Sequence, residues 1–494
     1  MLLLPLDTKA REPLYEQMAH RIVELIDGGA LAVGDRLPPS RALADTLGLN
    51  RSTVLRAYQE LWALGYIESR PGSYTTVRQR ARRVERGASS GDSAVPWEKV
   101  ANAASRVLLD RHRRLATVRG DQVPKGTINF AGLAADRALA PVDDLRRAIN
   151  RLLARQGGMA LDYGDPAGYR PLREAIARRM QTHSVTVSPD EVLVTSGAQQ
   201  AIDLVLRMLA SPAARVVVEA PSYAAALPLF RANGYEPVEV PMRDDGMDLD
   251  ALERAFDVAR PTLVYTMPNF HNPTGITTSQ PHRERLLALC SAHGIPLVED
   301  GFEEEMKYFG RAVLPIKSMD HSNVVIYLGT FSKVLFPGLR IGWIAAHQDC
   351  IDRLTAIHRF ASLSASTLGQ VAIAHLCENG TFEAHLRRVH VAYRRRMQTL
   401  LRSMREHFPT RGVSWTEPNG GYTLWVRIER GTVTESQIVE RLTSAKVMVA
   451  AGSNFFAHPP RSASFRLSIS NLTEPDIEEG VRRIGRVLTQ IVGG

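Results

Sequence analysis

The chain has 494 residues, 44% of them hydrophobic and 6% aromatic, and a formal net charge of +9. This length is more than one hydrophobic core usually serves and predicts about three domains. The sequence has no run apolar enough for a membrane span, no signal-peptide pattern at its start, and no metal-ligand spacing among Cys290, Cys350 and Cys377. We therefore expect a cytoplasmic protein with reduced thiols, no bound metal and no membrane partner.

Positive charge is concentrated at the start of the chain. Residues 1–120 contain 19 Lys and Arg against 13 Asp and Glu, whereas the remaining residues contain 42 against 39. Two-thirds of the excess thus lies in the first quarter of the chain, which favours a nucleic-acid partner for that region.

The first apolar pattern predicts a helix-turn-helix. Apolar residues recur at helical spacing from Leu14 to Leu25, as in an amphipathic helix. A short helix near residues 40–47, a tight turn at 48–50 and a second helix over about 52–64 follow. Two short helices joined by a glycine-containing turn are typical of DNA-binding modules whose second helix enters the major groove.

Polar residues around these helices can reach phosphates and base edges. After the second helix, "YIESRPGSYTTV" predicts a hairpin with its turn at 70–73, a wing able to lie along the DNA backbone. A three-helix packing module with solvated arginines is the alternative. The residues that we expect to contact DNA are Arg41, Arg51, Ser52, Thr53, Arg56 and Arg70.

The stretches "LPPSRALADTLGLNRSTVLRAY" and "GYIESRPGS" resemble the winged-helix domain of the GntR family, and the resemblance covers residues 11–77. It implies a small α+β domain that binds double-stranded promoter DNA. Tyr74 departs from the family pattern, which usually has a further glycine in the wing, so the tip of the wing should differ in shape.

Residues 78–125 change in composition. "RQRARRVERGASSGDSAV" is rich in arginine and then in serine and glycine, without apolar periodicity, and predicts a basic flexible linker. Within it, the run 97–115 has a helical apolar face. The linker arginines either contact DNA outside the groove or are solvated.

From about residue 127, short β-rich runs alternate with helical patterns. The runs are "EVLVT", "RVVVEA", "TLVYTM", "PLVED" and "VVIYLG". This alternation predicts an α/β domain with a mainly parallel sheet. Ligands of such sheets bind beyond the carboxyl ends of the strands, so polar residues at those ends are the ones to examine.

Five polar features follow these strands. They are the turn "SGAQ" at 196–199, Tyr223, Asn272 in "PNFHNPTG", Asp300 in "VED", and Lys333 with Arg340 in "FSKVLFPGLR". Each alone is ordinary, because a glycine turn is usually only a turn and an aspartate after a strand is usually a cap. Together they supply a phosphate cradle, an aromatic face, an amide, a carboxylate and an amine, and that set suits pyridoxal 5′-phosphate (PLP).

The chemistry of PLP gives each group a task. An amine condenses with the cofactor's aldehyde, and partial desolvation favours its neutral form, so Lys333 is the expected Schiff-base lysine. The carboxylate of Asp300 would keep the pyridine nitrogen protonated. Tyr223 would stack on the ring and Asn272 would bond its phenolic oxygen, while Arg340 and the amides of "SGAQ" would neutralise the phosphate.

This region also resembles the fold-type I aminotransferases (class I/II) along residues 127–490, through "DYGDPAGYRPLREAIA", "PNFHNPTG", "GTFSKVLFPGLRIGW" and "FRLSIS". The resemblance implies phosphate contacts from Ala198, Gln199 and Ser332, besides Arg340. It also implies that Tyr163 reaches the phosphate in a partner subunit's site, and that Arg466 binds a substrate or effector carboxylate. From the residues alone, an arginine in a late strand is more often a surface ion pair, so the role of Arg466 rests mostly on the resemblance.

Phe302 departs from the aminotransferase pattern. The family usually places a tyrosine after the aspartate, and its hydroxyl bonds the cofactor's 3′-oxygen; here the position is phenylalanine. Without that donor the oxygen should carry more negative charge and hold the neighbouring Schiff-base proton more tightly.

A winged helix followed by an aminotransferase-like domain resembles the MocR/GabR-type subgroup of GntR regulators. The resemblance implies a PLP-dependent transcription factor, active as a homodimer, that senses a small amino compound. One alternative is a working PLP-dependent aminotransferase whose winged helix only localises or autoregulates it. A second is an empty dimerisation scaffold, which the complete cofactor set disfavours.

Overall fold

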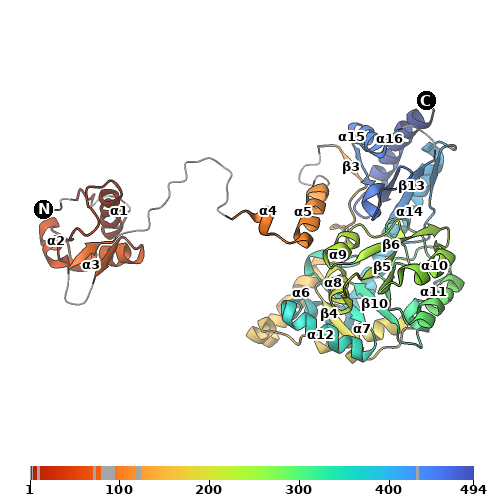
Figure 1. Ribbon diagram of the computed structural model, residues 1–494, viewed down its shortest axis with the longest axis horizontal. Helices are drawn as coiled ribbons and strands as arrows, with labels where there is room; N and C mark the ends of the chain where they lie inside the picture. The colour runs from red at the N-terminus through yellow and green to blue at the C-terminus, as the bar shows by residue number, and fades with distance from the viewer. Residues whose placement is uncertain are drawn as a thin grey trace. The chain divides into compact units, whose positions relative to one another are not determined.

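A computed structural model of the chain describes residues 2, 4–7, 10, 12–69, 74–78, 95–116, 124–429 and 433–493. Its contacts divide the chain into two units, Met1–Pro96 and Trp97–Gly494 (Figure 1). Each unit has a hydrophobic core of its own. None of the described helices is long and apolar enough to cross a bilayer.

The smaller unit is a three-helix module with a short antiparallel hairpin. Its elements are α1 (Leu14–Asp27), α2 (Ser40–Leu47), α3 (Arg51–Ala63), β1 (Ile67–Ser69) and β2 (Thr75–Val77). Met18, Ile22 and Leu43 are buried where the helices meet. Gly48 follows α2 at φ 63°, a left-handed conformation that lets the chain turn sharply into α3. The expected helix-turn-helix is present, and the expected wing turn at 70–73 lies outside the described residues.

The larger unit begins with two helices from the region expected to be linker. They are α4 (Trp97–Val100) and α5 (Ala103–Ala116). The partly buried residues Ala104, Val107 and Arg111 share one face of α5, which packs against α9 (Ala226–Ala232). Arg111 donates to Asn454 through Nη1 to the side-chain Oδ1 and through Nη2 to the main-chain oxygen, both at 2.8 Å. This part of the region is therefore helical and anchored, because one face of α5 finds partners on the larger unit.

An eight-stranded sheet forms the centre of the larger unit. Its strands, in spatial order, are β4 (Val192–Thr195), β11 (Gly342–Ala345), β10 (Val325–Thr330), β9 (Leu297–Asp300), β8 (Leu263–Thr266), β5 (Arg215–Ala220), β6 (Glu236–Arg243) and β7 (Gly246–Met247). The strands from β10 to β6 pair in parallel, whereas β11 is antiparallel to both of its neighbours. All five β-rich runs of the sequence lie in this sheet, so the α/β class is confirmed.

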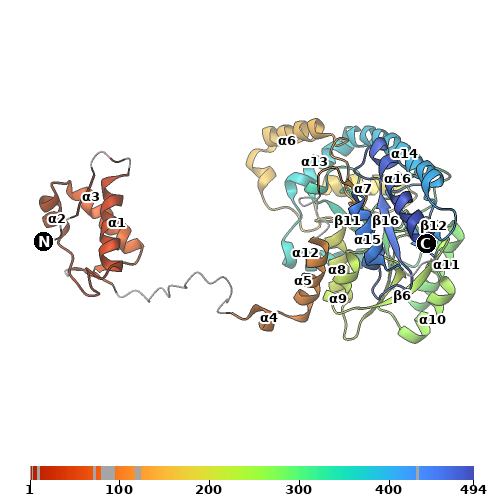
Figure 2. The ribbon, with the colours of Figure 1, turned by 90° about the horizontal axis from the view of Figure 1, so that it is seen from above.

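Helices cover both faces of the sheet, as Figures 1 and 2 show. Besides α9 they are α7 (Arg170–Thr182), α8 (Ala198–Leu209), α10 (Leu249–Ala259), α11 (Gln280–His293), α12 (Gln348–Ser362) and α13 (Thr367–Glu378), whereas α6 (Val142–Gln156) packs on the outside of α13. Adjacent residues of β4 enter different cores: Leu193 packs with Ile202 and Leu354, whereas Val194 packs with Ile176 and Phe331. This alternation is the consequence of burying a strand on both sides.

The C-terminal part of the larger unit is an antiparallel sheet backed by long helices. Its strands are β12 (Val413–Trp415), β13 (Thr423–Ile428), β16 (Ser464–Ser468) and β15 (Ala450–Ala451), and its helices are α14 (Thr381–His407), α15 (Glu435–Ser444) and α16 (Glu474–Val492). A separate parallel pair joins β3 (Ile128–Asn129) to β14 (Val447–Met448). This pairing fixes the first strand of the unit against its last third and brings the segment after β3 to the central sheet.

Candidate functional site

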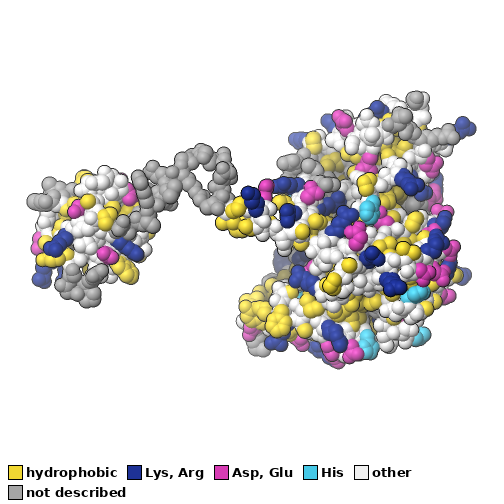
Figure 3. Space-filling view, in the orientation of Figure 1, with side chains coloured by type: hydrophobic (Ala, Val, Ile, Leu, Met, Phe, Trp, Pro, Cys, Tyr) yellow, Lys and Arg dark blue, Asp and Glu magenta, His cyan; other side chains and the backbone are white. Residues whose placement is uncertain are grey.

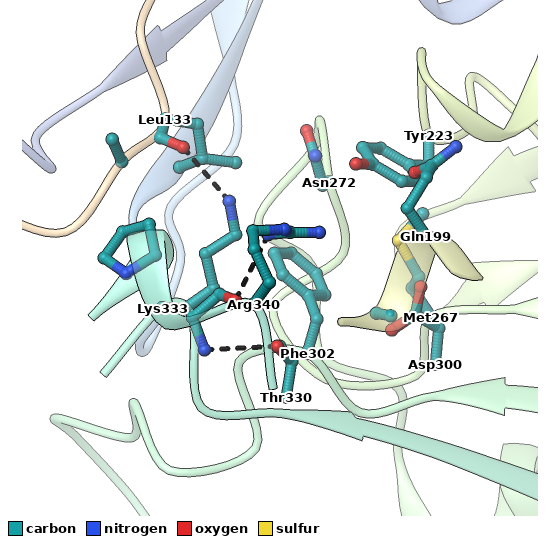
Figure 4. A pocket seen from close by; sticks show the side chains of 14 residues that line it. Leu133, Gln199, Tyr223, Met267, Asn272, Asp300, Phe302, Thr330, Lys333 and Arg340 are labelled. Carbon is teal, nitrogen blue, oxygen red and sulfur yellow. Dashed lines mark hydrogen bonds between the residues drawn. The ribbon is translucent and has the colours of Figure 1, made fainter. Parts of the chain in front are cut away.

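A pocket opens at the carboxyl ends of the parallel strands, where the sequence predicts a ligand (Figure 4). Chain segments after β3, β4, β5, β8, β9 and β10 contribute to it. The residues that line it are Leu133, Ala134, Ala198, Gln199, Tyr223, Met267, Asn272, Asp300, Phe302, Thr330, Ser332, Lys333, Pro337 and Arg340. Eight of the predicted cofactor residues are thus brought together, although they span more than 140 positions of the chain.

Lys333 extends into the pocket from the segment after β10. The Nζ of Lys333 donates to the main-chain oxygen of Leu133 at 3.0 Å. The main-chain oxygen of Lys333 accepts the hydroxyl of Tyr422 at 2.8 Å. Removal from water lowers the pKa of Lys333, although the nearby carboxylates oppose this shift. The site thus holds an amine in place and favours its neutral, nucleophilic form.

Asp300 is the last residue of β9 and is only 2% exposed. Its Oδ2 accepts a hydrogen bond from the hydroxyl of Tyr265 at 2.6 Å, whereas its Oδ1 is buried without a partner among the described residues. Burial raises the pKa of Asp300 to about 6. An ionised carboxylate with one unfilled oxygen is costly in a dry site, and the ring N–H of PLP would fill it.

The turn between β4 and α8 forms an anion cradle with Arg340. Gly197 has φ 87°, and α8 begins at Ala198 with no side chain capping its free N–H groups. Arg340 donates from Nη2 to the main-chain oxygen of Ser196 at 3.1 Å and from Nη1 to Ser332 Oγ at 3.4 Å. Helix N–H groups, the helix dipole and a guanidinium at one point suit a phosphate.

We expect Gly197→Ala to weaken PLP binding about tenfold or more, because a Cβ there would lie 2.5 Å from Arg340 Nη2 and the positive φ disfavours any side chain. Titration of cofactor-free protein with PLP, followed by absorbance, measures this loss. Gly338→Ala is the matched control, since Gly338 is near Arg340 in sequence, has open space around its Cα and lacks a positive φ. Equal losses in the two variants would contradict the cradle.

Asn272 lies at the pocket wall in a loop held by a buried pair. His271 Nε2 lies 3.2 Å from Glu219 Oε2, and Glu219 Oε1 accepts the hydroxyl of Thr266 at 2.5 Å. The side chain of Asn272 in turn accepts Arg466 Nη1 at 2.9 Å. The loop that carries Asn272 is therefore held in position by buried ionisable groups that do not line the pocket.

Arg466 lies behind Asn272 rather than in the lining of the pocket. It is 6% exposed, donates from Nη2 to the main-chain oxygen of Ala131 at 2.5 Å, and has its guanidinium 5.2 Å from the centre of the Phe455 ring. Its Nε is buried without a partner among the described residues. Burial lowers the pKa of Arg466 to about 10, so it remains charged at neutral pH.

The remaining predicted residues divide between the two units. Tyr223 lines the pocket, and burial raises the pKa of its hydroxyl to about 12, so the ring faces the site uncharged. Phe302 also lines it, at the position where the resemblance expects a tyrosine. Tyr163 does not reach this pocket; it is 81% exposed on the surface.

On the smaller unit, Arg41, Arg51 and Ser52 are exposed at the starts of α2 and α3, and Thr53 is partly exposed beside them. The guanidinium of Arg56 lies 4.0 Å above the ring of Tyr15, which holds it in place. Arg70 lies outside the described residues.

Known proteins match the two units separately and together. Residues 14–77 match the family of bacterial regulatory proteins of the gntR type, and residues 129–484 match the family of class I and II aminotransferases. The chain is 30% identical over 483 residues to the uncharacterised HTH-type transcriptional regulator YisV of Bacillus subtilis, covering 96% of both chains. It is 28% identical to the probable rhizopine catabolism regulatory protein MocR of Rhizobium meliloti, over 98% of this chain and 95% of that one.

Among solved structures, the chain resembles LysN, an α-aminoadipate aminotransferase from Thermus thermophilus, in complex with N-(5′-phosphopyridoxyl)-L-leucine. The match has a TM-score of 0.73 and 34% identity, and covers 80% of this chain and 99% of LysN.

Proposed function

The chain belongs to the class I and II aminotransferase family and, with its gntR-type domain, is a MocR-like regulator with PLP as its cofactor; from this premise we propose that it senses a small amino compound at the PLP site and alters promoter binding in response. The observation that carries the proposal is a complete amine, carboxylate and phosphate cradle in the same chain as a helix-turn-helix.

The cofactor, when bound, supplies an aldehyde that condenses with amines and a ring that draws electrons from the bonds around the amino carbon. Asp300 would hold the ring nitrogen, and Arg340 with the start of α8 would hold the phosphate. Tyr223 and Phe302 would form walls of the ring site and exclude water.

Lys333 would hold the cofactor until an incoming amine replaces it. The main-chain oxygen of Leu133, 3.0 Å from Nζ, is then available to the released amine. Arg466 would bind a carboxylate of the ligand, since a charged guanidinium with two donors suits that group. A ligand moves the DNA-binding equilibrium only if it binds the two forms of the protein with unequal affinity.

We also propose a homodimer in the bacterial cytoplasm, with Tyr163 contributing to the partner's phosphate site. Near Tyr163, the main-chain oxygen of Asp162 accepts the hydroxyl of Thr367 at 3.3 Å, so this segment packs beside the start of α13. Large apolar side chains are exposed there: Leu161 at 66%, Phe360 at 91% and Leu363 at 54%. Figure 3 shows hydrophobic side chains gathered on this part of the larger unit, near α6. A second copy would cover such a patch.

The DNA arm of the proposal is tested with Arg51→Ala. Loss of one groove contact should weaken binding about 5- to 150-fold on duplex DNA selected from a randomised pool. Arg21→Ala is the control, because Arg21 is exposed on α1 and pairs with Glu24 at 2.7 Å. A gel-shift titration in which Arg51→Ala binds like the wild type would contradict the assigned recognition helix.

The ligand arm is tested by titrating PLP-loaded protein with amino acids and amines while recording the cofactor absorption and the DNA affinity. A ligand that changes both supports the sensor. Conversion of the cofactor to its pyridoxamine form, with a keto acid taking the amine back and no change in DNA affinity, would identify a working aminotransferase instead. Lys333, Asp300 and Arg466 are all present, so this second activity is chemically available.

A further inference from the structure

The hairpin β1–β2 of the smaller unit is extended by a third segment, the residues just before α2. The N–H of Leu37 donates to the main-chain oxygen of Thr75 at 2.9 Å, and Arg36 forms an antiparallel bridge with Thr76. Leu37 is 2% exposed and packs in the core. Because successive side chains of an extended segment point to opposite faces, Arg36 points to the solvent face of the hairpin, where it is exposed.

Tyr74 meets Arg36 on this face. It lies two positions before Thr76, the residue that pairs with Arg36, so the two side chains are diagonal neighbours across the segments. The guanidinium carbon of Arg36 lies 4.3 Å from the centre of the Tyr74 ring, within the range of a cation–π contact. Tyr74 itself remains 55% exposed. The ring therefore orients the guanidinium without removing it from solvent.

The hydrogen-bond donors of Arg36 are unused among the described residues, where no carboxylate pairs with it. The nearest carboxylate in sequence, that of Asp35, accepts the N–H of Ala32 at 2.7 Å. Glu68 pairs with Thr76 from the β1 side, so its backbone is about two strand spacings, roughly 10 Å, from that of Arg36. Stacking occupies the face of a guanidinium and leaves the N–H groups in its plane free to bond an anion.

This pair is tied to the helices that we expect to contact DNA. The main-chain oxygen of Pro38, two residues after Arg36, accepts the hydroxyl of Tyr58 from α3 at 2.8 Å. Arg41 follows at the exposed start of α2. The family pattern has a glycine where this chain has Tyr74. A glycine lets the backbone approach a ligand closely, whereas a tyrosine keeps the backbone away, so a contact here is made by side chains.

We propose that Arg36 and Tyr74 form a phosphate-binding site for duplex DNA, beside the residues that read the groove. The guanidinium would donate to the non-bridging oxygens of one phosphodiester, and the Tyr74 hydroxyl would donate to the same group. A phosphate is the same at every base pair, so this site should add affinity equally to all duplexes. It rests on the proposed binding of DNA and adds two residues to the set predicted from the sequence.

The test measures the affinity of full-length, PLP-loaded protein for the selected duplex and for a scrambled duplex of equal length, over a range of salt concentrations. Arg36→Ala should weaken both by the same factor, up to about eightfold at about 0.1 M salt. The slope of log affinity against log salt should become shallower by about 0.9, the value of one phosphate contact. Arg36→Lys keeps the charge and should keep the slope. Arg21→Ala is the control, because Arg21 already pairs with Glu24, and should leave affinity and slope unchanged.

Two variants of the tyrosine separate its two tasks. Tyr74→Phe keeps the ring under the guanidinium and removes only the hydroxyl, whereas Tyr74→Ala removes both. Each should weaken the two duplexes by equal factors, and Tyr74→Ala should weaken them more.

Three results would overturn the phosphate site. They are a wild-type slope in Arg36→Ala, a loss confined to the selected duplex, and a loss that is matched by a lower melting temperature while the slope stays unchanged. In each case the proposed function stands if the wild type binds the selected duplex and Arg51→Ala weakens that binding. Failure of the wild type to bind either duplex would overturn the proposed DNA binding and the phosphate site together.

Discussion

Replacing Lys333 with alanine is expected to abolish covalent attachment of PLP and every response of DNA affinity to amino ligands. The amine is the group that condenses with the cofactor's aldehyde, and the other lining residues supply no second amine. The absorption band of the lysine-linked cofactor should be absent at every PLP concentration. Ligand-free DNA affinity should remain at the wild-type value, because the helix-turn-helix lies in the other unit.

Lys307→Ala is the control for this prediction. Burial lowers the pKa of Lys307 as it does that of Lys333, but Lys307 does not line the pocket. It should keep the band and the response. A Lys333→Ala protein that still changes its DNA affinity with amino ligands would show that the signal does not pass through the covalent link.

The second large effect is expected from Asp300→Asn, which keeps the shape of the side chain and removes its charge. A charge-assisted hydrogen bond to the ring nitrogen becomes a neutral one, which costs about 2 kcal/mol, or roughly 30-fold in PLP affinity. The hydrogen bond from Tyr265, 2.6 Å long in the wild type, can still form, so the fold should be retained.

The pH dependence of PLP affinity tests the same role of Asp300. Asp300 has a raised pKa of about 6 in the cofactor-free protein, and only its ionised form can pair with a protonated ring nitrogen. Lowering the pH through about 6 should therefore weaken PLP binding in the wild type relative to Asp300→Asn. The phosphate of PLP titrates in the same range, but it does so equally in both proteins and cancels in the ratio of affinities. A ratio that stays constant through this range would mean that Asp300 does not hold the ring nitrogen.

Local sequence was enough to predict the residues whose position follows directly from a strand or a turn. Asp300 and Lys333 follow buried strands, and parallel strands deliver their ends to one edge, so their meeting in one pocket could be inferred. Gly197 and Arg340 could be paired for the same reason. Helix boundaries in the smaller unit also followed from apolar spacing and turn residues.

Residues that meet through tertiary packing could not be predicted. Leu133 lies 200 positions from Lys333 and arrives only because β3 pairs with β14. The sequence contains one weak indication for Tyr265, which is a phenol in an otherwise apolar strand. Nothing in the sequence distinguishes Glu303 from the other acidic residues of "GFEEEM". Its burial depends on the closure of a loop that is more than one hundred residues away in sequence.

The anchoring of α5 has a consequence for the ligand sensing that we propose. Arg111 hydrogen-bonds to both the side chain and the main chain of Asn454, and Nη2 also reaches the main-chain oxygen of Ala224 at 3.4 Å. These partners adjoin Tyr223 of the pocket wall and Phe455, on which Arg466 stacks. Any ligand that displaces either wall changes the work needed to detach α5 from the larger unit. If the proposed sensing acts through α5, linked equilibria are reciprocal, and DNA binding would alter ligand affinity by the same factor as the ligand alters DNA affinity. On that proposal the promoter is as much an effector of the ligand pocket as the ligand is of the promoter.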